Sequence, residues 1–191
     1  MIRLLYILLC ISTVYSCKSQ TISEDEIYEA LENIIEELEG EDWIKDGSPN
    51  YQYVLDKSFN ATSLIFDTER LFVNEPFEKY FSIEDKKAFQ NQVKWYKDFS
   101  YQQEKIRSKK ILHKQELDDI ISSDRKSFWE IYISRYGDVG FYDISFPLFS
   151  ADKKKMLVVM DSCLPHLCIS GVYLFTKENG RWKIKDGYKG I

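Results

Sequence analysis

The clearest pattern of apolar and polar positions lies in residues 141–188, and it predicts a series of β-strands. Asn179-Gly180 stands between two apolar-rich runs, which indicates a type I′ hairpin turn because both central residues of that turn need a positive φ. Trp182 and Ile184 alternate with basic residues, as expected of a strand that buries one face. The predicted cross-strand neighbours are Phe175 with Ile184 and Lys177 with Trp182.

A second hairpin is predicted just before this one, with its loop at residues 164–167. A symmetric register pairs Cys163 with Cys168 and gives the sheet two apolar faces. One face carries Met156, Val158, Met160, Tyr173, Phe175, Trp182 and Ile184, and the other carries Leu157, Val159, Val172 and Leu174. A further strand at 141–149 contains Pro147, which cannot donate to a ladder and marks an edge strand or a bulge. The pattern therefore predicts a four-stranded antiparallel meander.

Helical patterns dominate the part of the chain that precedes the meander. Ser23 and Glu26 form a capping box, and the helix that follows should end at Gly40. Its apolar stripe is Ile27, Leu31, Ile34, Ile35 and Leu38, and its strongly acidic outer face is expected to be solvated. A second capping sequence at Ser82 predicts a helix to about residue 97. Shorter helices are predicted at 116–122 and 125–136, and short strands at 51–55 and 109–113, whereas 64–81 gives no clear pattern.

These elements predict an α+β fold in which N-terminal helices pack on the C-terminal meander. The chain has 191 residues, of which 44% are hydrophobic and 30% charged, a composition typical of a globular domain. Aromatic residues reach 15%, which fits either dense packing or an aromatic-lined pocket. The net charge of −5 makes the chain a poor candidate for binding nucleic acid.

The N-terminal segment has the features of an export signal. Met1-Ile2-Arg3 is a short basic start, and the apolar run at 4–14 is shorter than the 20 or so residues that a membrane-spanning helix needs. We expect residues 1–16 to be removed as a signal peptide and residues 17–22 to form a tether. Residues 23–191 are expected to form a single α+β domain.

The sequence Val14-Tyr15-Ser16-Cys17 resembles the lipobox of bacterial lipoproteins, although Tyr15 stands where a small residue is usual. The resemblance implies that Cys17 becomes the N-terminus and carries acyl chains such as palmitate, which anchor the protein in a lipid bilayer of the cell envelope. Two or more chains give stable attachment. Lys18 stands where an Asp is associated, in some bacteria, with inner-membrane retention, so the resemblance favours the outer membrane.

Two cysteines, Cys163 and Cys168, remain in the expected exported domain. An oxidising compartment and a cross-strand register predict a disulfide that fixes the shape of the loop. The alternatives are a metal site of Cys163, His166 and Cys168, a redox pair, and two free thiols. The spacing of four residues differs from the usual Cys-x-x-Cys redox motif, and a metal site lacks an obvious fourth ligand nearby.

No recognised catalytic motif is present. The chain contains no G-x-S-x-G, no P-loop and no G-x-G-x-x-G, and its two histidines, His113 and His166, are interpreted as structural or surface residues. We therefore expect no cofactor and no metal, and the sequence gives no support for an enzyme.

The order of helices followed by a meander that ends in Gly-Arg-Trp-Lys-Ile resembles the cystatin-like and NTF2-like cone folds. That resemblance implies a pocket lined by Trp129, Tyr132, Tyr142, Tyr173 and Trp182. Three functional hypotheses follow. The chain is a non-catalytic envelope lipoprotein that binds an envelope partner or small ligand through the tip Leu164, Pro165, His166 and Leu167. It is a small-ligand pocket protein or enzyme of the cone-fold type. It is an immunity or protective lipoprotein, for example one that neutralises a toxin, and its acidic balance suits a basic partner.

Overall fold

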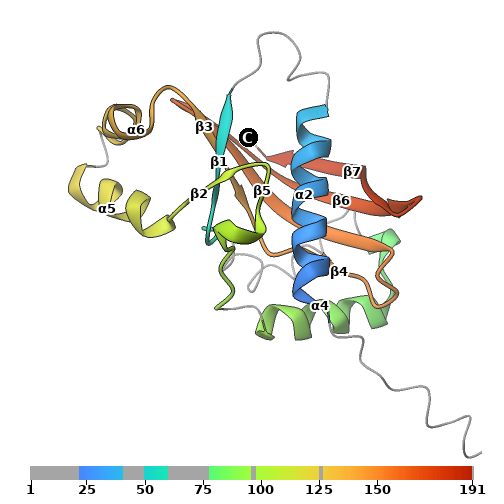
Figure 1. The fold of residues 1–191 in the computed structure, drawn as a ribbon. Helices are drawn as coiled ribbons and strands as arrows, with labels where there is room; N and C mark the ends of the chain where they lie inside the picture. The colour runs from blue at the N-terminus through green and yellow to red at the C-terminus, as the bar shows by residue number, and fades with distance from the viewer. Residues whose placement is uncertain (1–21, 41–49, 60–77, 96–97, 125–126, 191) are drawn as a thin grey trace, which may run out of the picture.

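The computed structural model describes residues 22–40, 50–59, 78–95, 98–124 and 127–190. Within this part of the chain, the strands form one seven-stranded mixed sheet in the order β2-β1-β3-β5-β6-β7, and β4 pairs with β5 away from that path (Figure 1). The strands are β1 (Tyr51–Leu55), β2 (Lys110–Leu112), β3 (Gly140–Ile144), β4 (Leu148–Phe149), β5 (Lys155–Leu164), β6 (Leu167–Glu178) and β7 (Arg181–Gly190). The signal peptide, Cys17 and nearly all of the tether lie outside the described residues.

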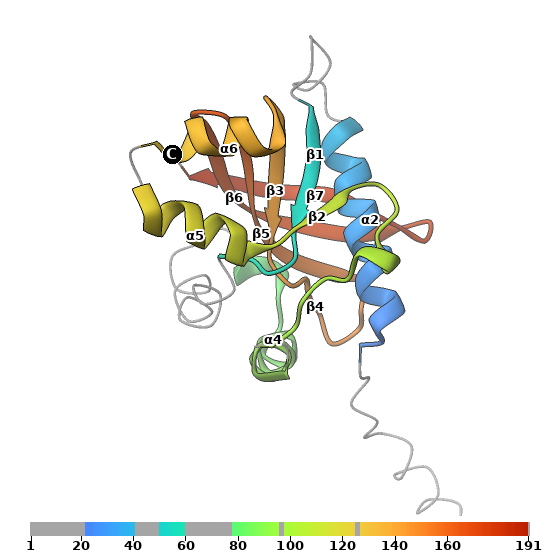
Figure 2. The same ribbon diagram turned by 60° about the vertical axis from the view of Figure 1, so that its left-hand side comes forward.

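The helices divide between the two faces of this sheet. The α-helices of the described residues are α2 (Glu24–Gly40), α4 (Ile83–Trp95), α5 (Lys114–Asp124) and α6 (Phe128–Tyr136). Helix α2 crosses one face, α5 and α6 lie beyond β1 and β3, and α4 lies at the end of the sheet near β4 (Figures 1 and 2). The predicted α+β class is therefore confirmed.

The predicted four-stranded antiparallel meander is not confirmed as the whole sheet. Strands β3, β5, β6 and β7 are antiparallel neighbours, but β1 pairs in parallel with both β2 and β3. Parallel neighbours need long crossover connections, so no local turn sequence indicates that they pair. The predicted strand at 141–149 is also divided: β3 ends at Ile144 and β4 begins at Leu148, on either side of Pro147, and both pair with β5.

The predicted hairpin registers are confirmed. Cys163 pairs with Cys168, Val158 with Tyr173 and Met156 with Phe175 in the first hairpin, and Phe175 pairs with Ile184 and Lys177 with Trp182 in the second. Asn179 and Gly180 both have the positive φ that the turn needs, 51° and 83°. The register shifts by one residue between Leu174 and Phe175, which leaves Lys185 as the extra residue of a bulge on β7.

The main core lies between α2 and the sheet. The apolar stripe of α2 is buried, and it packs against Met156, Val158, Met160, Tyr173, Phe175 and Trp182. The helix begins at the predicted capping box: the Glu26 amide donates to Ser23 Oγ at 3.2 Å, and Glu26 Oε2 accepts from the Ser23 amide at 2.8 Å. The sequence thus sets both where this helix begins and which side it buries.

The opposite face of the sheet carries two separate apolar clusters. Phe81 and Phe89 of the α4 region pack against Leu148, Leu157 and Leu174 at one end. Residues of α5 and α6, including Leu117, Ile120 and Tyr132, pack against β1, β2 and β3 at the other end. The second apolar face predicted for the meander is therefore covered by α4.

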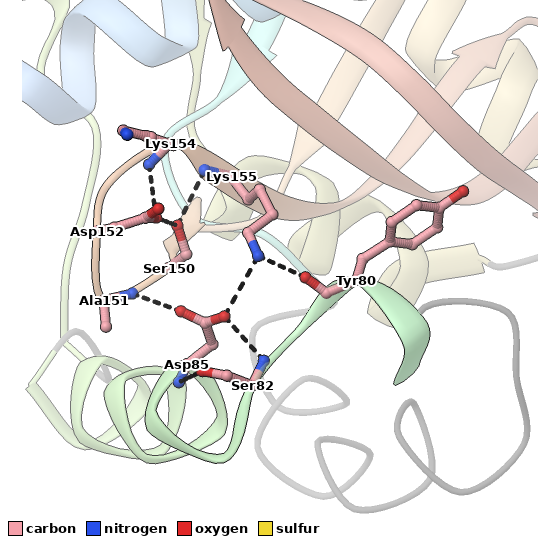
Figure 3. A network of polar contacts seen from close by, with 8 residues as sticks. All are labelled: Tyr80, Ser82, Asp85, Ser150, Ala151, Asp152, Lys154 and Lys155. Carbon is pink, nitrogen blue, oxygen red and sulfur yellow. Dashed lines mark hydrogen bonds and ion pairs between the residues drawn. The ribbon is translucent and has the colours of Figure 1, made fainter.

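A polar network fixes the start of α4 to the loop between β4 and β5 (Figure 3). Asp85 caps its own helix by accepting from the Ser82 amide at 2.9 Å, and it also accepts from the Ala151 amide at 2.8 Å. Lys155 Nζ lies 3.5 Å from Asp85 Oδ2 and donates to the Tyr80 carbonyl at 2.5 Å. The loop itself is closed by hydrogen bonds from Ser150 and Lys154 to Asp152. This network is structural, because Asp85 and Lys155 join the two segments and Asp152 closes the loop.

Candidate functional site

The tip of the β5–β6 hairpin is closed by the predicted disulfide. Cys163 and Cys168 are directly opposite each other, with an S–S distance of 2.12 Å. Leu164 pairs with Leu167 beyond them, and His166 adopts a positive φ of 68° to complete the turn. Leu167 is 52% exposed, whereas Leu164 and Pro165 are half-buried. The tip therefore presents one large aliphatic side chain on a covalently closed loop.

Helix α6 supports this tip from the side. The Trp129 ring lies 6.1 Å from the His166 ring and 6.3 Å from the Phe141 ring, and its centroid is 5.4 Å from that of Tyr132. Trp129 is half-buried. The structure thus brings Trp129 together with the hairpin tip, two features that the sequence suggested separately.

The five aromatic residues expected to line one pocket are divided between the two faces of the sheet. Trp129 and Tyr132 belong to the cluster under α5 and α6. Tyr142, Tyr173 and Trp182 belong to the core under α2, where Tyr142 stacks on Tyr51 at 4.3 Å and Trp182 contacts Phe149 at 5.6 Å. Because a sheet separates the two groups, they do not line a common cavity.

A surface pocket of about 270 Å³ lies where the C-terminal end of α2 meets the start of β7. Its charged residues already face one another: Arg181 is 3.4 Å from Glu36, and Lys183 is 2.6 Å from Glu37. Asn33 Oδ1 also accepts from the Trp182 amide at 3.2 Å. The polar groups of this pocket therefore serve to hold the helix on the strand.

The acidic outer face of α2 is paired with cations of the same chain. Its glutamates contact side chains from four other segments; the pairs are Glu24–Lys105, Glu26–Lys153, Glu29–Lys177, Glu36–Arg181, Glu37–Lys183 and Glu39–Lys109. Glu32 accepts from the Arg107 amide at 2.6 Å. The predicted solvated face is partly exposed, but its charge is largely neutralised within the fold.

A group of polar residues lies at the carboxyl ends of β1 and β2, and of these the sequence drew attention only to His113. Asp56 Oδ1 accepts from the Lys114 amide at 2.8 Å, and Asp56 Oδ2 lies 2.9 Å from His113 Nδ1. A carboxylate at this position caps the start of α5 from a neighbouring strand. His113 is exposed at the surface, in agreement with its interpretation as a structural or surface residue.

A buried carboxyl lies close by on β3. Asp143 is only 1% exposed, and it stands directly opposite Asp161 of β5. Asp143 Oδ2 accepts from the Phe59 amide at 3.0 Å, whereas Asp143 Oδ1 is buried with no hydrogen-bond partner among the described residues. Burial raises the pKa of Asp143 to about 7; a Ser58 hydrogen bond opposes the rise, and Asp161 adds to it. Asp143 stands between Tyr142 and Ile144, an alternation that is typical of a strand with one exposed face, so the sequence pattern does not indicate its burial.

Neither a metal site nor a membrane-spanning helix is found in the described part of the chain. No three His, Cys, Asp or Glu side chains among those residues gather in a way that could hold a metal ion. None of the helices they form is long and apolar enough to cross a bilayer. Comparison with protein-family models, with curated proteins and with solved structures found no match.

Proposed function

We propose that this chain is a non-catalytic lipoprotein of the bacterial cell envelope that is anchored through acylated Cys17 and binds an envelope protein through the β5–β6 tip. The lipobox-like sequence supports the anchor. One structural observation carries the binding function: Leu167 is 52% exposed at the end of a loop that a disulfide closes.

A closed tip lowers the entropic cost of binding, because the loop does not need to become ordered when a partner is bound. Trp129, beside His166, holds the loop against α6. Leu167 can then enter an apolar pocket of the partner as an anchor, surrounded by the half-buried Leu164 and Pro165. This arrangement favours a protein partner over a small polar ligand, since the aliphatic Leu167 is exposed at the end of a hairpin.

The tip and the start of α2 lie at opposite ends of strand β5. The start of α2 lies beside the beginning of β5, where Lys153 Nζ is 2.8 Å from Glu26 Oε1. Strand β5 has 10 residues and runs from this point to the tip. At about 3.3 Å per residue, the strand separates the tip from the start of α2 by roughly 30 Å.

The test uses the full-length protein expressed in its native membrane, with a photoreactive residue at Ser170, which is exposed near the tip. The intact mass should correspond to a chain that begins at Cys17 and carries acyl groups. Leu167→Ser should lower the yield of the crosslinked partner roughly tenfold or more, because truncation of a hot-spot side chain costs about 2 kcal/mol or more, and about 1.4 kcal/mol corresponds to tenfold in affinity.

The matched control is Ile83→Ser, which replaces another aliphatic side chain, 68% exposed, at the start of α4. It should leave the crosslink unchanged. Neither substitution should alter the melting temperature, since both side chains are exposed. An unmodified N-terminus would refute the anchor, and an equal crosslink yield in wild type and Leu167→Ser would refute the role of the tip.

A further inference from the structure

Asp143 and Asp161 are the least expected pair of neighbours in the sheet. They are register partners on the antiparallel strands β3 and β5, so their side chains leave the same face. That face is the one covered by α5 and α6, since Phe141 and Cys163, two residues away on each strand, pack in the cluster beneath those helices. Two carboxyl groups are thus held side by side on the covered side of the sheet.

Both carboxyl groups cannot readily be ionised in this position. Like charges directly opposite each other destabilise a strand pair, and an ionised carboxylate without compensation is costly to bury. Asp143 Oδ2 has one donor, the Phe59 amide at 3.0 Å, and Ser58 adds a side-chain hydrogen bond. Asp143 Oδ1 is buried with no partner among the described residues. An oxygen without a partner is most costly to bury when it carries negative charge, and a proton on Asp143 Oδ1 removes that charge.

The charged groups around the pair do not remove the need for this proton. Asp161 faces Asp143 from β5 and disfavours its ionisation, and Lys114 at the start of α5 favours it. However, Lys114 Nζ is bound to Asp118 at 2.6 Å, and it lies 4.2 Å above the Phe59 ring. Tyr101 also interacts with Asp143, and burial raises the pKa of its hydroxyl, so it is uncharged. The ion pairs among the described residues do not include Asp143.

We propose that Asp143 and Asp161 form a proton-binding pair, in which the folded protein holds one proton on Asp143 beside the side chain of Asp161. The bond formed is O–H at Asp143 Oδ1, and the proton comes from the solvent during folding. The pair links β3 and β5 to the segment after β1 through the Phe59 amide. It makes the stability of this region depend on pH.

The direction of this pH dependence follows from the difference in proton binding between the folded and unfolded states. Burial raises the pKa of Asp143 to about 7 from 3.8, so between these values the folded state binds more protons than the unfolded state. Stability therefore falls as the pH rises through that window and levels off above it. With one proton of difference, the equilibrium constant for unfolding rises about tenfold per pH unit within the window.

The test follows the aspartate carboxyl carbons by NMR and the urea unfolding curve between pH 4 and 9. In the wild type, one carboxyl should titrate near neutral pH, and Asp143→Asn should abolish that titration and flatten the pH dependence of unfolding. Asp161→Asn should shift the remaining titration to lower pH, because it removes the neighbouring carboxylate. Asp138→Asn, at an exposed aspartate just before β3, serves as the control and should change neither.

Three outcomes would overturn the proposal. The first is that no carboxyl titrates above pH 5 in the folded wild type, a measurement that needs no variant. The second is that Asp161→Asn leaves the Asp143 titration unchanged, which would make burial alone responsible. The third is that CaCl2, MgCl2 or KCl stabilises the wild type at pH 8 but not Asp143→Asn, which would assign a bound cation to the pair.

Discussion

Replacement of Asp85 by Asn should separate the start of α4 from the β4–β5 loop. Asp85 is 4% exposed and joins three groups: it accepts from the amides of Ser82 and Ala151, and Lys155 Nζ lies 3.5 Å away (Figure 3). Asparagine has nearly the same shape, but only one oxygen. Its amide NH2 must therefore face one of the two backbone N–H groups, and Lys155 loses its carboxylate.

The size of the effect follows from these contacts. A hydrogen bond to a charged group contributes about 1.5–3 kcal/mol, and a buried N–H left without an acceptor costs a similar amount. The loss of one such bond together with the Lys155 contact gives a decrease of roughly 3 kcal/mol in the free energy of unfolding. For a domain of this size, that corresponds to a fall in melting temperature of about 6–12 °C.

The assay is urea and thermal unfolding of Asp85→Asn beside Glu84→Gln. Glu84 is the adjacent acidic residue in the first turn of α4 and is exposed, so its neutralisation should cost less than about 1 kcal/mol. A pH series adds a second readout. Burial raises the pKa of Asp85, but the Ser82 and Ala151 amides and the Lys155 charge more than offset this, so the pKa lies below its ordinary value of 3.8. The contribution of Asp85 to stability is therefore present above that value and is lost as the pH falls below it. Equal losses in the two variants would show that the network contributes nothing beyond the helix dipole.

Two further substitutions test the packing of the sheet and the closure of its tip. Gly140→Ala would place a Cβ 2.6 Å from the Tyr51 ring and 2.7 Å from the Cys163 carbonyl oxygen, so the free energy of unfolding should fall by about 3 kcal/mol. Gly40→Ala is the control and should be neutral, because the space around Gly40 is open. Equal melting temperatures of the two variants would contradict the close contact at Gly140. Replacement of Cys163 and Cys168 by Ser should lower the free energy of unfolding by about 2 kcal/mol, the value expected for a loop with a sequence separation of 5. The melting curve of the reduced wild type should match that of this variant, and no change on reduction would refute a stabilising role.

The hairpins could be predicted from the sequence because their registers depend on local signals. Asn179-Gly180 sets one turn, the Cys163–Cys168 pair sets the other, and a shift by one residue would move every apolar side chain to the wrong face. The parallel pairing of β1 with β2 and β3 had no such signal. Strand β1 and its partners are separated by long stretches of chain, so only the packing of the finished fold brings them together.

In the candidate sites too, only the features that depend on local sequence signals could be predicted. The closed tip was predictable, because a symmetric hairpin register places Cys163 opposite Cys168. The contact of Trp129 with His166 was not, since it depends on where α6 packs. The burial of Asp143 was also missed: in the apolar–polar alternation of β3 it occupies a position usually exposed to solvent, but here α5, α6 and the segment after β1 cover that face.

The ion pairs between the glutamates of α2 and basic residues of the same chain also bear on the choice between the functional hypotheses. An immunity lipoprotein that neutralises a basic toxin would need an acidic surface free for the partner, and α2 carries the most concentrated acidic sequence among the described elements. The glutamates of that helix are instead bound to lysines and to Arg181 of the same chain, or, for Glu32, to backbone amides. A basic partner would have to displace these contacts. Each exposed pair is worth at most about 1 kcal/mol, and a new exposed pair with the partner would be worth no more, so the exchange would give little net attraction. Recognition through the apolar Leu167 requires no such exchange. Partner binding should therefore depend only weakly on salt, and this distinguishes contact through the tip from electrostatic capture by α2.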